Sequence, residues 1–127
     1  MKHMLIAALV LWTQWAMAAT DSTTIFVSQV LHDTEKTYAI QQLVAKQDPR
    51  TFALLLAINN KKLYLFNNEA VTTGEKNEAS SYEIYSLYPK NELLVNRNGQ
   101  PLHTSIAALT VVEISRADRL LLNGILP

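Results

Sequence analysis

Two histidines, His32 and His103, are the residues after position 18 that best suit metal binding or proton transfer. Asp33 and Glu35 follow His32, but a structural zinc site requires about four ligands, and the chain has neither a cysteine nor a His-x-x-x-His pair. Ser105 follows His103, but a nucleophilic serine also requires an orienting group and an oxyanion hole, which no motif marks. The sequence therefore predicts no catalytic residue, no metal site and no cofactor.

Acidic residues gather between positions 69 and 83, where paired carboxylates would suit glycoside hydrolysis. They are Glu69, Glu75, Glu78 and Glu83. The surrounding stretch is polar, so a solvated loop explains these residues better than an acid–base pair. An enzyme with an unrecognised acid–base pair is the least favoured hypothesis. The few glycines are scattered, so no glycine-rich phosphate loop is present.

Three tyrosines, Tyr82, Tyr85 and Tyr88, recur at every third position and are candidates for an interaction surface. Tyrosine combines a flat apolar ring with one polar tip, which favours it at interfaces. On a single strand, Tyr82 and Tyr88 would share one face and Tyr85 would lie on the other. Packing within a sheet is the simpler explanation, because tyrosine also favours strands. The alternative is a periplasmic protein that binds a small ligand on this sheet.

The first 18 residues have the three parts of a secretory signal peptide. Lys2 and His3 form a basic start, an apolar stretch follows, and Ala16-Met17-Ala18 is a small-x-small cleavage signal. A membrane-spanning helix needs about 20 apolar residues, so an uncleaved anchor is less favoured. We expect cleavage after Ala18, a periplasmic or secreted protein, and no stable membrane insertion afterwards.

The composition predicts one globular domain over residues 19–127 and argues against charged partners. The chain has 11 basic and 11 acidic residues, and removal of the leader leaves 10 basic against 11 acidic, a formal charge of −1. Nucleic acids and anionic lipids are bound by clustered lysine and arginine, which this chain lacks. The absence of cysteine excludes disulfides, so the fold must depend on an apolar core.

Residues 19–60 have helical patterns. The expected helices cover residues 20–31, 35–45 and 49–58. Asp48 is placed to cap the third of these, Pro49 suits its first position, and Arg50 is placed to bond back to the turn. These three residues are therefore interpreted as structural. The third helix is almost entirely apolar, so Phe52, Leu55 and Leu56 are candidates for contact with a partner.

Residues 61–103 have the pattern of β-hairpins. Strands are expected at residues 62–66, 69–71, 82–88 and 93–95. Asn67-Asn68 and Asn98-Gly99 predict tight turns, the second of type I′, and polar residues 72–81 predict a mobile loop. Residues 104–127 are expected to be mainly helical, with one turn near residues 104–109, an extended piece, and a last helix capped by Ser115.

The segment Ala39–Ile58, AIQQLVAKQDPRTFALLLAI, resembles the junction of a HEAT repeat, in which Asp-Pro-Arg turns the chain between helices. The layout downstream, from Leu63-Tyr64 through Asn98–Leu102 to a last helix near Arg116, resembles the exported N-terminal region of urea-type ABC transporter permeases. The resemblance covers nearly all of residues 19–127. The chain departs from the family by stopping at Pro127, without further helical repeats or membrane spans. This leaves three alternatives: a stand-alone relative, a truncated copy, or an unrelated helix-plus-hairpin protein.

The expected fold is α+β, with a HEAT-like helical hairpin packed on a small antiparallel sheet and closed by a C-terminal helix. The resemblance implies no catalytic residue. It implies an exported, non-enzymatic accessory or interaction module, associated with the uptake of urea or a similar amide. The expected partner is another exported or membrane protein, with no role for nucleic acid.

Overall fold

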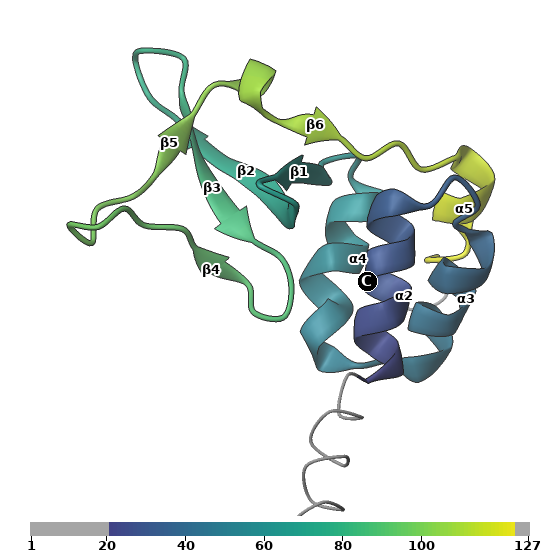
Figure 1. The fold of residues 1–127 in the computed structure, drawn as a ribbon. Coiled ribbons are helices and arrows are strands. Elements are labelled where there is room, and N and C mark those ends of the chain that lie inside the picture. The colour runs from purple at the N-terminus through teal and green to yellow at the C-terminus, as the bar shows by residue number, and fades with distance from the viewer. Residues whose placement is uncertain (1–20, 124–127) are drawn as a thin grey trace, which may run out of the picture.

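The computed structural model describes residues 21–123 and shows a mixed α+β fold. Figure 1 places the helices together on one side and the strands on the other. The expected leader, residues 1–18, lies outside the described residues. The helical elements are α2 (Ser22–His32), α3 (Thr37–Lys46), the 3-10 turn η1 (Pro49–Thr51), α4 (Phe52–Asn59), the 3-10 turn η2 (Ile106–Ala108) and α5 (Arg116–Leu120). The strands are β1 (Tyr64–Phe66), β2 (Glu69–Lys76), β3 (Tyr82–Ser86), β4 (Glu92–Leu93), β5 (His103–Thr104) and β6 (Thr110–Val111).

Helices α2, α3 and α4 lie side by side and alternate in direction (Figure 1). The Asp21 side chain caps α2 by accepting a hydrogen bond from the Thr24 amide at 2.9 Å. Helix α3 buries Ala39, Ile40 and Leu43, the stripe that a 3.6-residue period produces. It ends at Lys46, and the next residue, Gln47, has a φ of 51° that turns the chain out of the helix. The three expected helices are thus confirmed, with ends that shift by a few residues.

The strands form one antiparallel sheet in the order β4-β3-β2-β1-β6, and β5 pairs with the remaining part of β3. Asn67 and Asn68 make the tight turn between β1 and β2, with φ values of 51° and 64°. The prediction of a mobile loop over residues 72–81 is wrong in its first half, because β2 continues to Lys76 and pairs with β3. Only the stretch between Lys76 and Tyr82 is a loop, and the Asn77 side chain organises it.

The second hairpin returns the chain near Asn98-Gly99, as expected, but with a different turn. Gly99 has a φ of 76°, whereas Asn98 is not among the described residues with positive φ, so the turn is not of type I′. The Asn96 side chain instead accepts hydrogen bonds from the amides of Asn98 and Gln100. The Asn96 side chain therefore holds this turn together with two backbone hydrogen bonds, which the Gly99 amide donates to the Asn96 carbonyl and the Asn96 amide donates to the Gln100 carbonyl.

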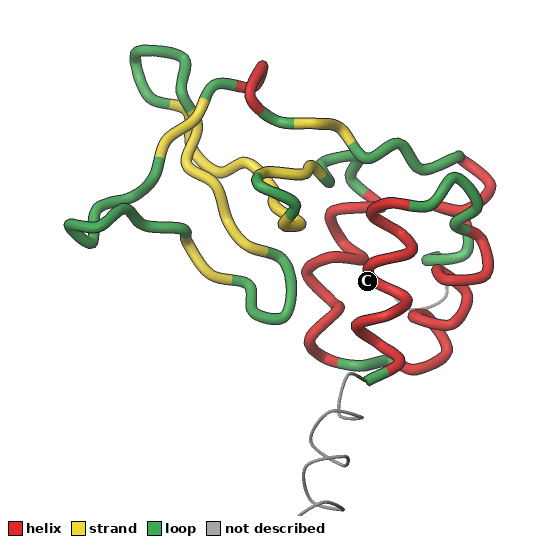
Figure 2. Tube along the Cα trace, in the orientation of Figure 1, coloured by secondary structure: helices red, strands yellow, loops and turns green. Residues whose placement is uncertain are grey.

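The segment after the second hairpin contains the expected helical turn η2 and the expected last helix α5. The expectation that this segment is mainly helical is wrong for residues 104–123, because these two short elements leave most of that stretch extended or in turns. The Ser115 hydroxyl caps α5 by accepting a hydrogen bond from the Asp118 amide at 3.1 Å. Between them, Thr110–Val111 joins the sheet as its edge strand β6. The chain then runs past the end of the helices to α5 (Figures 1 and 2).

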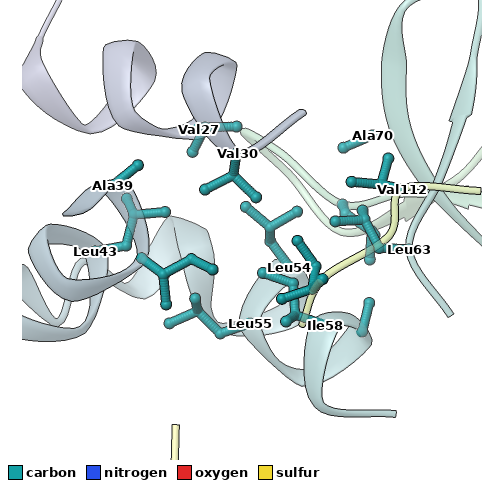
Figure 3. Close-up of a cluster of buried hydrophobic side chains, with 14 of the residues drawn as sticks. Val27, Val30, Ala39, Leu43, Leu54, Leu55, Ile58, Leu63, Ala70 and Val112 are labelled. Atoms are coloured by element: carbon teal, nitrogen blue, oxygen red, sulfur yellow. The ribbon is translucent and has the colours of Figure 1, made fainter. Parts of the chain in front are cut away.

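The main core lies between the three helices and one face of the sheet (Figure 3). Leu54, Leu55 and Ile58 of α4 belong to the same buried cluster as Leu63 and Ala70 from the strand region. A second, smaller core lies on the other sheet face, because side chains alternate along each strand. Its members are Val71, Ile84 and Leu109, with Tyr64, Phe66, Leu94 and Leu102 packed against them.

Candidate functional site

The outer face of α4 exposes two large apolar side chains one turn apart. Phe52 is 47% exposed and Leu56 is 45% exposed. Positions i and i+4 lie on the same side of a helix, so the two residues form one ridge, named here the α4 ridge. Leu55 was predicted to join this surface and does not, because it points into the main core and is fully buried. The all-apolar sequence of α4 gave no basis for telling the two leucines apart.

The turn before α4 is held by a network around Arg50, in which Asp48, Pro49 and Arg50 make the cap and turn contacts expected from the sequence. The Asp48 carboxylate accepts a hydrogen bond from the Arg50 amide at 3.0 Å, and Pro49 is the first residue of η1. The Arg50 guanidinium donates to Asp48 Oδ2 at 2.7 Å and to Asp21 Oδ2 at 2.8 Å. Hydrogen bonds from Arg50 hold the pKa of Asp48 well below its ordinary value.

Tyr88 joins this network instead of lying on the sheet. Its hydroxyl and the Thr24 hydroxyl are 2.7 Å apart, and the Arg50 guanidinium carbon lies 5.6 Å from the centre of its ring. Strand β3 ends at Ser86, so the expectation that Tyr82 and Tyr88 share a strand face is wrong. Tyr88 instead connects the loop after β3 to the start of α2.

Tyr85 and Tyr82 lie on opposite faces of β3, as the alternation of a strand requires. The Tyr85 ring covers Gly74 of β2, since a Cβ atom added there would lie 2.6 Å from Tyr85 Cε2. Tyr82 is two residues from Ile84 and therefore lies on the same face of β3, the face of the second core. The three tyrosines are consequently divided among three environments and do not form one surface.

An open cleft of about 560 Å³ lies beside the segment that leads from β6 to α5. Its apolar floor contains Ile58, Leu63 and Ile114, which are buried. Its charged lining consists of Lys36, Lys61, Glu113, Asp118 and Arg119. Residues from the start of α3, the end of α4 and the cap of α5 therefore meet at one place that sequence periodicity did not mark.

Lys36 is the half-buried cation of this cleft. Its ammonium donates a hydrogen bond to the Val30 carbonyl near the end of α2, at 2.6 Å. Burial lowers the pKa of Lys36 because removal from water disfavours the charged form. Lysine has three N–H donors, so this one bond leaves donors for another acceptor.

Asp118 is the buried acid of the cleft, with 9% of its surface exposed. Its Oδ1 accepts a hydrogen bond from the Thr37 hydroxyl at 2.6 Å, and this bond joins α5 to the first turn of α3. Within residues 21–123, the only ion pairs are those that Arg50 makes, so no cation of that range is paired with Asp118. The carboxylate thus retains capacity for a further donor.

The two histidines first considered are both exposed and belong to separate parts of the fold. His32 is the last residue of α2, and His103 lies in β5. Among residues 21–123, no three acidic or histidine side chains gather closely enough to hold a metal ion. The histidines therefore lie apart from the cleft and from the α4 ridge.

Comparison of the chain with protein-family models, with curated proteins and with solved structures finds no match. Helices of the described range, residues 21–123, are all too short or too polar to cross a membrane. The features of the described residues that bear on function are therefore the α4 ridge, the Arg50 network and the cleft.

Proposed function

We propose that this protein is an exported, non-enzymatic accessory module that binds another exported or membrane protein through the α4 ridge. The observation that carries the proposal is the pair Phe52 and Leu56, two large apolar side chains that are nearly half exposed on one helical face. A helix normally turns such residues toward a core, so an apolar ridge left in water favours a partner surface.

The neighbouring contacts support the use of α4 as a rigid binding element. Leu54, Leu55 and Ile58 anchor its opposite face in the main core. The Arg50 network fixes its first turn through Asp48 and Asp21. A preorganised helix loses little conformational freedom when it binds, and this lowers the free-energy cost of association.

The nature of the partner follows from the resemblance to HEAT repeats. Helical repeats of this class bury their apolar faces by stacking on neighbouring helix pairs. We propose that α3 and α4 act as such a pair and that a helix of the partner packs on Phe52 and Leu56. The resemblance to the exported region of urea-type permeases supports the further proposal that this partner belongs to a system for the uptake of urea or a related amide.

Site-specific photocrosslinking tests the ridge directly. A photoreactive amino acid at position 52 should form a crosslink to one defined membrane or exported protein in cells that express a urea-type transporter. The matched control places the same group at Gln41, an exposed residue of α3. In a second experiment, the photoreactive group is moved to a position near the α4 ridge. The double variant Phe52→Ala and Leu56→Ala should then abolish the crosslink, whereas the control variant Gln41→Ala should retain it. Equal crosslinking from positions 52 and 41 would refute the ridge as a binding site.

Export is tested separately by sequencing the N-terminus of the purified protein. We expect the chain to begin at Ala19, because Ala16-Met17-Ala18 fits the cleavage pattern of signal peptides. Cell fractionation should recover this shortened form outside the cytoplasm. Recovery of a full-length chain beginning at Met1 from the cytoplasm would contradict the proposed location.

A further inference from the structure

We propose that the cleft between the α3 start and the segment Val111–Ser115 binds a small zwitterion, namely a free amino acid with an aliphatic side chain. This is a second site, separate from the α4 ridge, and it does not depend on the function proposed above. Its volume of about 560 Å³ lies within the range of ordinary small-molecule sites.

The cationic residues that line the cleft suit the carboxylate of such a ligand. These residues are Lys36, Lys61 and Arg119. Lys36 and Arg119 are held in place because each donates to a backbone carbonyl, Lys36 to Val30 and Arg119 to Ile114. Each of them retains further N–H donors, and hydrogen bonds from a cation to a carboxylate are among the stronger ones in proteins.

The acidic residues that line the cleft suit the ammonium group. Asp118 is almost fully buried, accepts one side-chain hydrogen bond from Thr37, and has no paired cation within residues 21–123. Its Oδ2 atom has no hydrogen-bond partner within residues 21–123 and is not sealed from solvent, so it is free to accept a hydrogen bond from an ammonium in the cleft. Glu113, which is exposed at the rim, supplies a second negative charge.

The floor of the cleft selects the side chain of the ligand. Ile58, Leu63 and Ile114 supply buried apolar surface there. An aliphatic chain that covers this floor removes apolar area from water and adds favourable free energy. The combination of both charges with an apolar floor favours an aliphatic amino acid over a simple carboxylic acid or a simple amine.

Three probes of related shape test this selection: L-norleucine, hexanoate, which lacks the ammonium, and pentylamine, which lacks the carboxylate. Binding to the full chain is measured by titration calorimetry and by amide chemical shifts. Loss of one charged hydrogen bond should weaken hexanoate and pentylamine at least about tenfold relative to norleucine. Shift changes should centre on the residues that line the cleft.

Two variants locate the site. Lys61→Gln and Glu113→Gln each remove one exposed charge from the rim and should weaken norleucine binding several-fold without unfolding the chain. The matched control is Lys62→Gln, which changes the adjacent exposed lysine that does not line the cleft. Absence of norleucine binding, equal binding of the three probes, or equal effects at Lys61 and Lys62 would each overturn the proposal.

Discussion

Gly74 is the residue on which the Tyr85 ring rests. A Cβ atom at position 74 would lie 2.6 Å from Tyr85 Cε2 and 3.2 Å from Cδ2, so alanine forces the ring to move. Alanine normally favours a strand over glycine, but the displaced ring outweighs that gain. We expect Gly74→Ala to lower the free energy of unfolding by about 1 kcal/mol in urea denaturation.

A double-mutant cycle separates the strand preference of alanine from the cost of displacing the Tyr85 ring. In a Tyr85→Ala background the ring is absent, so Gly74→Ala should be neutral or stabilise by a few tenths of a kcal/mol. Similar destabilisation in both backgrounds would show that the Tyr85 ring is not the cause.

The Arg50 network predicts a pH-dependent contribution to stability. Because hydrogen bonds from Arg50 lower the pKa of Asp48 below its ordinary 3.8, the ionised form stabilises the fold above that pH. The contribution is lost as pH falls through the lower pKa of the folded state. Arg50→Gln should therefore be less stable than wild type near neutral pH, and the difference should narrow in acid.

Urea denaturation across a pH series measures this difference, and added salt should also narrow it, because the network is solvent-exposed. Arg116→Gln is the control, since Arg116 is exposed and forms no ion pair among the described residues. A difference between wild type and Arg50→Gln that stays constant from neutral pH into acid would rule out this linkage.

At the scale of single residues, the sequence predicted local hydrogen bonds better than it predicted contacts between distant positions. The cap of Asp48 and the bond from Arg50 followed from local spacing, and both are present. The contacts of Arg50 with Asp21 and Tyr88 join positions far apart in the sequence, so no local pattern indicated them. The cleft was not predicted for the same reason, because its lining residues come from segments far apart in the sequence.

Helix α4 offers a direct comparison of burial, because Leu55 and Leu56 are adjacent and chemically identical. Leu55 is fully buried and Leu56 is 45% exposed. Leu55→Ala should lower the free energy of unfolding by about 2–5 kcal/mol through lost packing and a new cavity. Leu56→Ala should change it by less than about 1 kcal/mol. Urea denaturation of the two variants checks this, and equal losses would contradict the placement of the ridge.

At the scale of elements, helices were predicted more reliably than strands. Their caps and apolar periods are local signals, as α3 illustrates with its stripe of Ala39, Ile40 and Leu43. The second half of β2 was missed because it is polar, and its pairing with β3 comes from tertiary structure. Strands of two residues, such as β4 and β6, are likewise set by their partners rather than by their own sequence.

For the whole molecule, the shared main core predicts one cooperative unfolding transition. Leu63, Ala70 and Leu87 from the strand region lie in the same core as the helices. Loss of either part exposes apolar surface of the other, so neither should remain folded alone. Helical circular dichroism and the amide signals of β2 and β3 should therefore have the same urea midpoint. A sheet that melts clearly before the helices would show that the two parts are independent.

Residues near the end of the described range complete the main core, which the helices at its start form in part. Val112, Ile114 and Leu122 belong to the main core, and Asp118 bonds to Thr37, a residue 81 positions earlier. During synthesis, α2, α3 and α4 leave the ribosome long before these contacts can form. The helices therefore lack part of their apolar interior until residues 112–122 have also left the ribosome, and their packing is completed only then.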